Sequence, residues 1–263
     1  MKQNKRLNNM NNSIALKSIL NKEIQRFMRI WVQTLVPPAI TISLYFVIFG
    51  SLIGSRIGDM GGFDYMSFIV PGLIMMSVIT NSYSNVASSF FSAKWQRNVE
   101  EMLVAPVPNW VIVAGYVGGG MARGMLVGLI VTLVSLLFVD IKIHNIWVII
   151  ATVSLTSAIF SLGGLINAIF AGSFDDISII PTFILTPLTY LGGVFYSISL
   201  LPDFWQGVSQ INPIVYMVNA FRYGFLGVTD VNITVAFTVI GALIVTLFAI
   251  AMTLINKGIG LRS

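Results

Sequence analysis

The sequence lacks most of the residue types that catalysis needs. It has no cysteine and one histidine, and only 10% of its 263 residues are charged. This excludes disulfides, a thiol nucleophile and metal centres built on cysteine or on a histidine cluster. No Gly-x-x-x-x-Gly-Lys-Ser/Thr loop, His-Glu-x-x-His motif, Ser/His set or pair of intramembrane aspartates occurs. We therefore assign no catalytic, cofactor-binding or metal-ligating residues, and no ATP-binding loop.

Apolar residues dominate the chain. They make up 56% of it, and the mean hydropathy is +0.86, whereas about a quarter of a soluble domain is charged. A helix needs about 20 apolar residues to cross the hydrocarbon core. We predict an all-α integral membrane protein with a transmembrane domain over 32–263 and six spans, at 32–54, 65–91, 111–139, 146–171, 177–200 and 233–256.

Positive charge gathers in residues 1–31. Residues 1–12 are polar and Asn-rich, which is typical of a disordered tail. From Ser13 to Trp31 apolar residues alternate with bases at helical spacing, which indicates an amphipathic helix in the headgroup region. In this layout eleven lysines and arginines lie on the side of the termini and three on the other. The positive-inside rule then predicts cytoplasmic termini in a bacterial inner membrane, with lipids as partners and no nucleic acid.

A charged island over 92–110 separates the second and third spans. Lys94, Arg97 and Glu101 share one helical face, and Pro106 ends the pattern. The apolar side chains of this region also follow helical spacing: Phe91, Trp95, Val99, Met102 and Leu103. We predict a short amphipathic helix at the membrane surface that contacts a partner. The alternative is an ordinary solvated loop.

The second span carries a polar stripe along one helical face: Asn81, Ser84, Asn85, Ser88 and Ser92. Lipid cannot satisfy such groups, so the stripe must face protein or water, as a subunit seam or as the lining of a pathway. Arg123 is the only ionisable residue deep within a span. It is either a functional group or a structural cation that is paired to carbonyls or reaches toward an interface. Small residues that recur every four positions predict close helix contacts: Gly120, Gly124 and Gly128, and Gly164, Ala168 and Gly172.

The segment 201–227 is too apolar for a water-exposed loop, but Pro213 and Arg222 interrupt it and neither half is long enough to cross. We predict short periplasmic re-entrant helices that dip into the outer leaflet. Their functional interpretation is a lid over a pathway. The residues that we single out in this region are Trp205, Asn212, Pro213, Asn219 and Arg222.

Two motifs carry a resemblance to a known family. The stretches Arg97-x-x-x-Glu101-x-Leu103-x-x-Pro106-Val107 and Asn212-Pro213-Ile214-x-x-x-x-Asn219-Ala220-x-Arg222-Tyr223-x-x-Leu226-Gly227 resemble the hallmark stretches of ABC-2 type permeases. Residues 190–196 and 257–263 bring the chain closest to one group of inner-membrane permeases in that family. Asn219 departs from the pattern, because many relatives carry an acid there.

The resemblance implies the membrane-spanning subunit of an exporter, without enzyme activity of its own. It would form the translocation pathway as a homodimer and bind two copies of a separate ATPase subunit. The helix over 92–104 would be the coupling helix, and the turn over 172–176 a second contact. The coupling residues would be Lys94, Trp95, Arg97, Glu100, Glu101, Leu103, Asp175 and Asp176. The implied substrate is amphipathic, lipid-linked or drug-like.

Two other functions are less well supported by the sequence. A membrane-embedded enzyme of lipid or glycan metabolism would place clustered acids at one interface, and outside the island only Asp175 and Asp176 are adjacent there. An ion-coupled secondary transporter would need broken helices in two repeated halves and intramembrane acids, and the sequence shows neither.

Overall fold

The computed structural model describes residues 2–49, 58–141 and 143–261, with side chains from residue 12 onward. The helices are α1 (Lys2–Arg29), α2 (Trp31–Phe46), α4 (Tyr65–Trp95), α5 (Asn98–Val104), α6 (Asn109–Ser135), α7 (Ile146–Phe170), α8 (Asp176–Ile180), α9 (Thr186–Tyr190), α10 (Asp203–Ile211), α11 (Pro213–Leu226) and α12 (Ile233–Lys257). A π-helical turn, η2 (Pro181–Leu185), joins α8 to α9, and a 3-10 turn, η3 (Ile198–Leu200), precedes α10. The strands β1 (Asp59–Met60) and β2 (Phe63–Asp64) form a small antiparallel hairpin in which Met60 pairs with Phe63.

The protein is an all-α membrane protein, as predicted. Among the described residues, five helices are long and apolar enough to cross a membrane: Trp31–Phe49, Tyr65–Trp95, Asn109–Ser135, Ile146–Phe170 and Ile233–Lys257. The predicted span over 177–200 is helical only as far as Tyr190. The run from α8 to α9 therefore rises roughly 22 Å, short of the ~30 Å hydrocarbon core. It ends where Gly193 adopts a left-handed conformation with φ +73°, which favours glycine.

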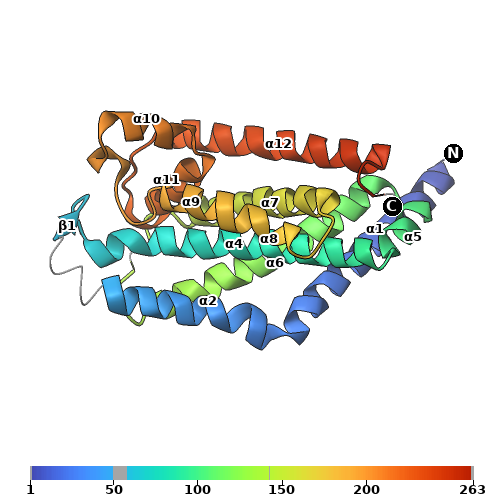
Figure 1. Ribbon diagram of the computed structural model, residues 1–263, viewed down its shortest axis with the longest axis horizontal. Helices are drawn as coiled ribbons and strands as arrows, with labels where there is room; N and C mark the ends of the chain where they lie inside the picture. Colours follow the sequence, from blue (N-terminus) through green and yellow to red (C-terminus); the bar gives the residue numbers. More distant parts are fainter. Residues whose placement is uncertain (1, 50–57, 142, 262–263) are drawn as a thin grey trace.

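The helices lie side by side along the long axis of the molecule (Figure 1). The start of α1 and the end of α12 lie at one end of the bundle, together with α5, and we call this the α5 end (Figure 1). The β1–β2 hairpin and α10 lie at the opposite end, which we call the α10 end (Figure 1).

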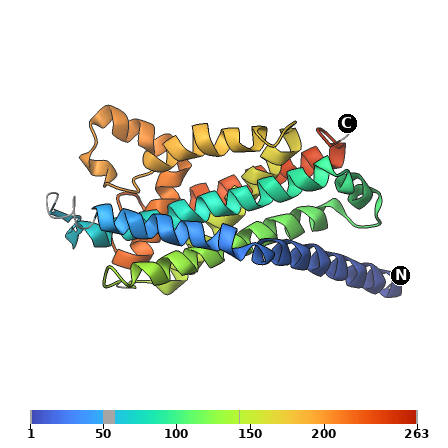
Figure 2. The same ribbon diagram turned by 60° about the horizontal axis from the view of Figure 1, so that its bottom comes forward.

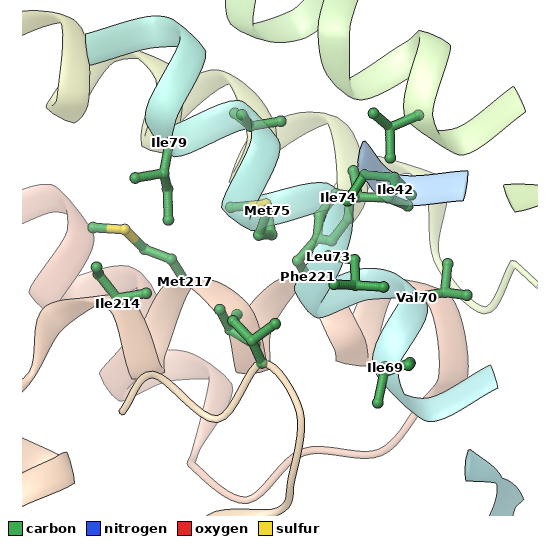
Figure 3. Packing of buried hydrophobic residues seen from close by; sticks show 14 of the residues in the cluster. Ile42, Ile69, Val70, Leu73, Ile74, Met75, Ile79, Ile214, Met217 and Phe221 are labelled. Carbon is green, nitrogen blue, oxygen red and sulfur yellow. The ribbon is translucent and has the colours of Figure 1, made fainter. Parts of the chain in front are cut away.

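The core is built around α4. Most residues of this helix are buried, because α6, α7, α11 and α2 pack around it. Leu73, Ile74 and Val78 are fully inaccessible. Figure 3 shows side chains of α4 packed toward Met217 and Phe221 of α11. By contrast α12 is mostly exposed, so its outer face is available to lipid.

Small residues let α6 and α7 approach α4 closely. A side chain at Gly124 would overlap the Ser82 hydroxyl of α4, and one at Gly164 would overlap the Tyr83 carbonyl. The predicted close contacts at these glycines are confirmed. Gly172 is an exception, because α7 ends at Phe170 and this residue lies in the turn that follows.

The predicted disordered tail over 1–12 is wrong, since α1 is helical from Lys2. A helix forms there because the helical apolar spacing that begins at Ser13 continues a segment free of proline and glycine. Figure 2 shows α1 running from its junction with α2 toward the α5 end, beside α6. Nearer the junction, Ile19 and Glu23 pack against glycines of α6. A place for α1 in the headgroup region stays a prediction.

Candidate functional site

The predicted single helix over 92–104 is wrong, because the chain breaks at Arg97. This residue has φ +61° and is the only non-glycine residue with positive φ in the described part of the chain. Its N–H donates to the Lys94 carbonyl at 2.9 Å, which closes α4, and α5 begins at the next residue. The left-handed turn redirects the backbone so that Val99, at 2% exposure, returns to the core.

The break also divides the predicted apolar face. Val99 is buried, whereas the Trp95 side chain is 64% exposed. Trp95 lies beside Phe174, with ring centroids 6.1 Å apart, and Phe174 packs edge-on against Phe91 at 4.8 Å. Phe174 is itself 53% exposed. The two exposed rings form a patch that the protein leaves uncovered.

Lys94 has a structural role. Its Nζ donates to the carbonyl oxygens of Ile169 at 2.6 Å and Ala171 at 2.9 Å. These carbonyls lie at the end of α7, where the carbonyl oxygens of the last turn have no N–H donor within the helix. Lys94 therefore fixes the turn that follows α7 against α4.

The turn after α7 is closed by Asp176. Its carboxylate accepts from the N–H groups of Gly172 at 2.8 Å and Ser173 at 3.0 Å. These hydrogen bonds, led by that from Gly172, lower the pKa of Asp176 below its ordinary value. Asp175, the neighbouring acid, is exposed.

A pocket of about 410 Å³ lies at the α5 end, between the end of α4 and the turn that follows α7. Four of the predicted coupling residues line it, Lys94, Trp95, Arg97 and Glu100, together with Phe91, Ala171, Gly172, Gly260 and Leu261. Glu101 is exposed on α5 and Leu103 is half-buried, both outside the lining. The contribution of Gly260, beyond α12, was not predicted. We call the exposed part of this region, with Trp95, Phe174, Arg97, Glu100 and Glu101, the α5 surface.

The polar stripe of α4 faces other helices of the same chain over much of its length. The Asn81 side chain accepts from Arg123 of α6 at 2.9 Å. The Asn85 side chain and carbonyl each accept from Arg26 of α1 at 2.8 Å. The Ser88 hydroxyl donates to the carbonyl of Ser84 within α4. Arg123 therefore binds a side-chain amide rather than the carbonyls that were expected of a structural cation.

An acid on α1 completes this network and was not predicted. Glu23 is 0% exposed, accepts from the Ser89 hydroxyl at 2.7 Å and lies 3.4 Å from Arg26. The signal was present in the sequence, because Glu23 is the only acid in the basic arm and stands three residues before Arg26, one helical turn away.

A second buried arginine organises the α10 end. Arg222 is 1% exposed, donates to the Gly193 carbonyl at 2.6 Å and stacks 3.9 Å from the Phe68 ring. Its acid partner is Asp230, at 3.9 Å. Asn219 does not pair with Arg222, and instead its side-chain oxygen accepts from the Asp230 N–H at 2.9 Å. Position 219, where many relatives carry an acid, thus provides no partner for the charge of Arg222, and Asp230 provides it instead.

The segment 201–227 forms two short helices, α10 and α11, as its pattern predicts. Asn212 caps α11 by accepting from the Ile214 N–H at 3.0 Å, and it also donates to the Leu188 carbonyl at 2.6 Å. Pro213 occupies the first position of α11, where it is favoured because its missing N–H needs no partner there. Trp205 is 46% exposed on α10.

Comparisons with known proteins agree with this architecture. The family model described as "ABC-2 type transporter" matches residues 14–226. The inner membrane transport permease YadH of Escherichia coli (strain K12) is 67% identical over 251 residues, which cover 95% of this chain and 98% of that protein. Nodulation protein J of Rhizobium leguminosarum bv. viciae is 22% identical over 215 residues, or 81% of this chain and 83% of that protein.

Proposed function

Because the chain belongs to the ABC-2 type transporter family, we propose that it acts in an exporter as a homodimer driven by two copies of a separate ATPase subunit. Its resemblance to the YadH-type inner-membrane permeases is confirmed, and it is a membrane permease subunit of an ABC transporter. Dimerisation, the direction of transport and the ATPase contact are the parts that we propose. The substrate would be amphipathic, lipid-linked or drug-like.

The α5 surface is the observation that carries the ATPase contact. An exposed aromatic pair surrounded by charges has the composition of a protein interface, with an apolar anchor inside a polar rim. Trp95 is more than half exposed although it is the last residue of the core helix α4. The pairing of two exposed aromatic rings with charged neighbours favours a protein partner over a merely solvated loop.

The test reverses one charge of this surface. Glu101→Lys places a like charge or an unpaired base against the ATPase, which costs several kcal/mol at an interface, and Trp95→Ala removes the apolar anchor, at roughly 1 to 4 kcal/mol. We expect normal amounts of inserted permease but loss of co-purification with an ATPase expressed from a neighbouring gene. Asp203→Lys is the matched control, since Asp203 begins α10 at the opposite end. Unchanged co-purification of Glu101→Lys and Trp95→Ala would contradict the contact.

The orientation is also a proposal. With the α5 end in the cytoplasm, both termini would be cytoplasmic, and α10 and α11 would enter the outer leaflet as re-entrant helices. The excess of lysine and arginine near the termini supports this orientation. Reporter fusions at Asn12 and Ser263 should both give a cytoplasmic signal, and a periplasmic signal from either would overturn it.

A further inference from the structure

A groove of about 330 Å³ runs between α2 and α4. These two helices lie side by side (Figures 1 and 2) but touch little, because α2 packs mainly against α6. Its lining is mixed, with apolar, hydroxyl and charged groups that include Pro38, Thr41, Tyr45, Thr80, Ser84 and Arg123. Thr41 and Thr80 are exposed, so the groove is accessible from outside the chain.

Two guanidinium groups bind successive turns of α4, and they differ in their charge balance. Arg26 binds Asn85 and has the Glu23 carboxylate at 3.4 Å. Arg123 binds Asn81 one turn away, yet no acid of the described residues forms an ion pair with it. The lining of the groove contains no aspartate or glutamate, and the buried Nε of Arg123 has no hydrogen-bond partner among the described groups.

An arginine in the middle of a span is costly to keep without a counter-charge. The Asn81 oxygen offers only one acceptor, whereas a guanidinium has five N–H groups in a planar fork. That fork matches the oxygens of a phosphate or a carboxylate, which it binds at two points. The missing counter-charge, the open groove and its apolar walls together favour a ligand with an acidic head and an apolar tail.

We propose that the α2–α4 groove binds the anionic head group of an amphiphile that enters from the bilayer and is the exported substrate. Arg123 pairs with the phosphate or carboxylate, while Asn81 holds the guanidinium in place. The apolar wall of the groove, with Pro38 and Tyr45, lies against the tail. This inference rests on the proposed export function and narrows its substrate to acidic amphiphiles.

Native mass spectrometry of the purified permease in a neutral detergent tests the head-group preference. The probes are dioleoyl phosphatidic acid and dioleoyl phosphatidylcholine, which share their tails. We expect the wild type to prefer the acidic lipid about tenfold or more, the order of one charged hydrogen bond. Arg123→Gln should abolish the preference and Arg123→Lys should retain part of it. Arg97→Gln, which removes an exposed guanidinium at the α5 end, should leave it unchanged.

Two further measurements separate a ligand site from a structural cation. Arg123→Gln should unfold in detergent at nearly the wild-type temperature, whereas Arg26→Gln strands the buried Glu23 and should unfold earlier. A drop for Arg123→Gln as large as that for Arg26→Gln would overturn the proposal. So would equal binding of the two lipids by the wild type, or an equal loss of preference in Arg97→Gln.

Co-expression with the ATPase distinguishes a transported substrate from a resident lipid. Phosphatidic acid in phosphatidylcholine nanodiscs should stimulate ATP hydrolysis by the wild-type complex and not by the Arg123→Gln complex. Arg123→Gln should still co-purify with the ATPase, because the α5 surface is intact. Binding without stimulation would overturn the assignment as substrate. A wild type that fails to co-purify with the ATPase would instead contradict the proposed function and leave the lipid-binding result standing.

Discussion

The two ends of the bundle differ in how they place their charged side chains. At the α10 end Arg222 is buried, and Gly193, Phe68 and Asp230 surround it within the same chain. At the α5 end Arg97, Glu100 and Glu101 are exposed beside the uncovered ring of Trp95. The buried arginine of the α10 end is therefore surrounded by groups of its own chain, whereas the charges of the α5 end are open to a partner. Mutations at the α10 end should affect folding, and mutations at the α5 end should affect assembly.

The largest effect should come from the close contact of α6 with α4 and α7 along the middle of the bundle. Gly124→Leu would force α6 away from the Ser82 and Ser157 hydroxyls of α4 and α7. We expect a loss of about 3 kcal/mol in the free energy of unfolding, the upper range for overpacking, and little folded protein. Gly241→Leu is the matched control, since no atom lies within 4 Å of a Cβ at that position in α12. The yield and the stability in detergent are measured for both variants. Equal values would show that the contact at Gly124 tolerates a large side chain.

A smaller loss should follow at the α10 end when its acid is neutralised. Asp230→Asn keeps the size of the side chain but removes the charge beside Arg222 and weakens the bonds from Ser197 and Ile198. Because Asp230 is 21% exposed, we expect about 2 kcal/mol, within the range for hydrogen bonds to charged groups. Thermal unfolding in detergent measures it.

Asp203→Asn serves as the control for this variant. Asp203 is exposed at the start of α10 and at the same end of the molecule, so its neutralisation should change the unfolding temperature little. If both variants unfold alike, the Arg222 cluster is not what holds the α10 end together.

The spans were largely predictable from hydropathy, because the bilayer sets both their length and their polarity. The predicted 233–256 and the observed Ile233–Lys257 differ by one residue. The early end of the fifth helical run was not predicted. Residues 191–200 are apolar enough to continue a span, and hydropathy does not register the left-handed turn at Gly193.

The polar partners were less predictable than the spans. Arg222 and Asp230 stand eight residues apart in sequence, but Asp230 lies beyond α11, and only the fold of the following turn brings its carboxylate back. The break at Arg97 was missed for another reason. Helical periodicity continues through it, and nothing in an arginine indicates positive φ. Prediction thus succeeded for the spans, where the bilayer sets the sequence pattern, and failed for features that depend on one contact or one backbone turn.

The break at Arg97 is itself open to test at the α5 end. A β-branched side chain is disfavoured at φ +61° even more than an arginine, so Arg97→Val should cost about 1 kcal/mol of folding stability relative to the wild type. Arg97→Gly removes the same charge without that penalty and should be close to neutral. Hydrogen exchange of the α5 amides reports whether the helix start is disturbed. Equal exchange in the two variants would mean that the turn does not depend on the backbone conformation at this residue.

The smallest effect should be a pH dependence confined to the turn after α7. The pKa of Asp176 is below its ordinary value because the Gly172 and Ser173 amides bond to the carboxylate. The stabilisation is therefore fully present above pH ~4, the unfolded pKa. It is lost as the pH falls through the lower, folded pKa.

Since Asp176 lies at the surface, only the turn after α7 should respond to pH, and Asp176→Asn should weaken this turn at every pH. Hydrogen exchange of these two amides, compared with Asp176→Asn, should show greater protection in the wild type at pH 7, with the difference shrinking below pH ~4. A difference that persisted undiminished into strong acid would show that the side-chain charge does not close this turn, and the α5 surface would lose the rigid loop on which Phe174 is held.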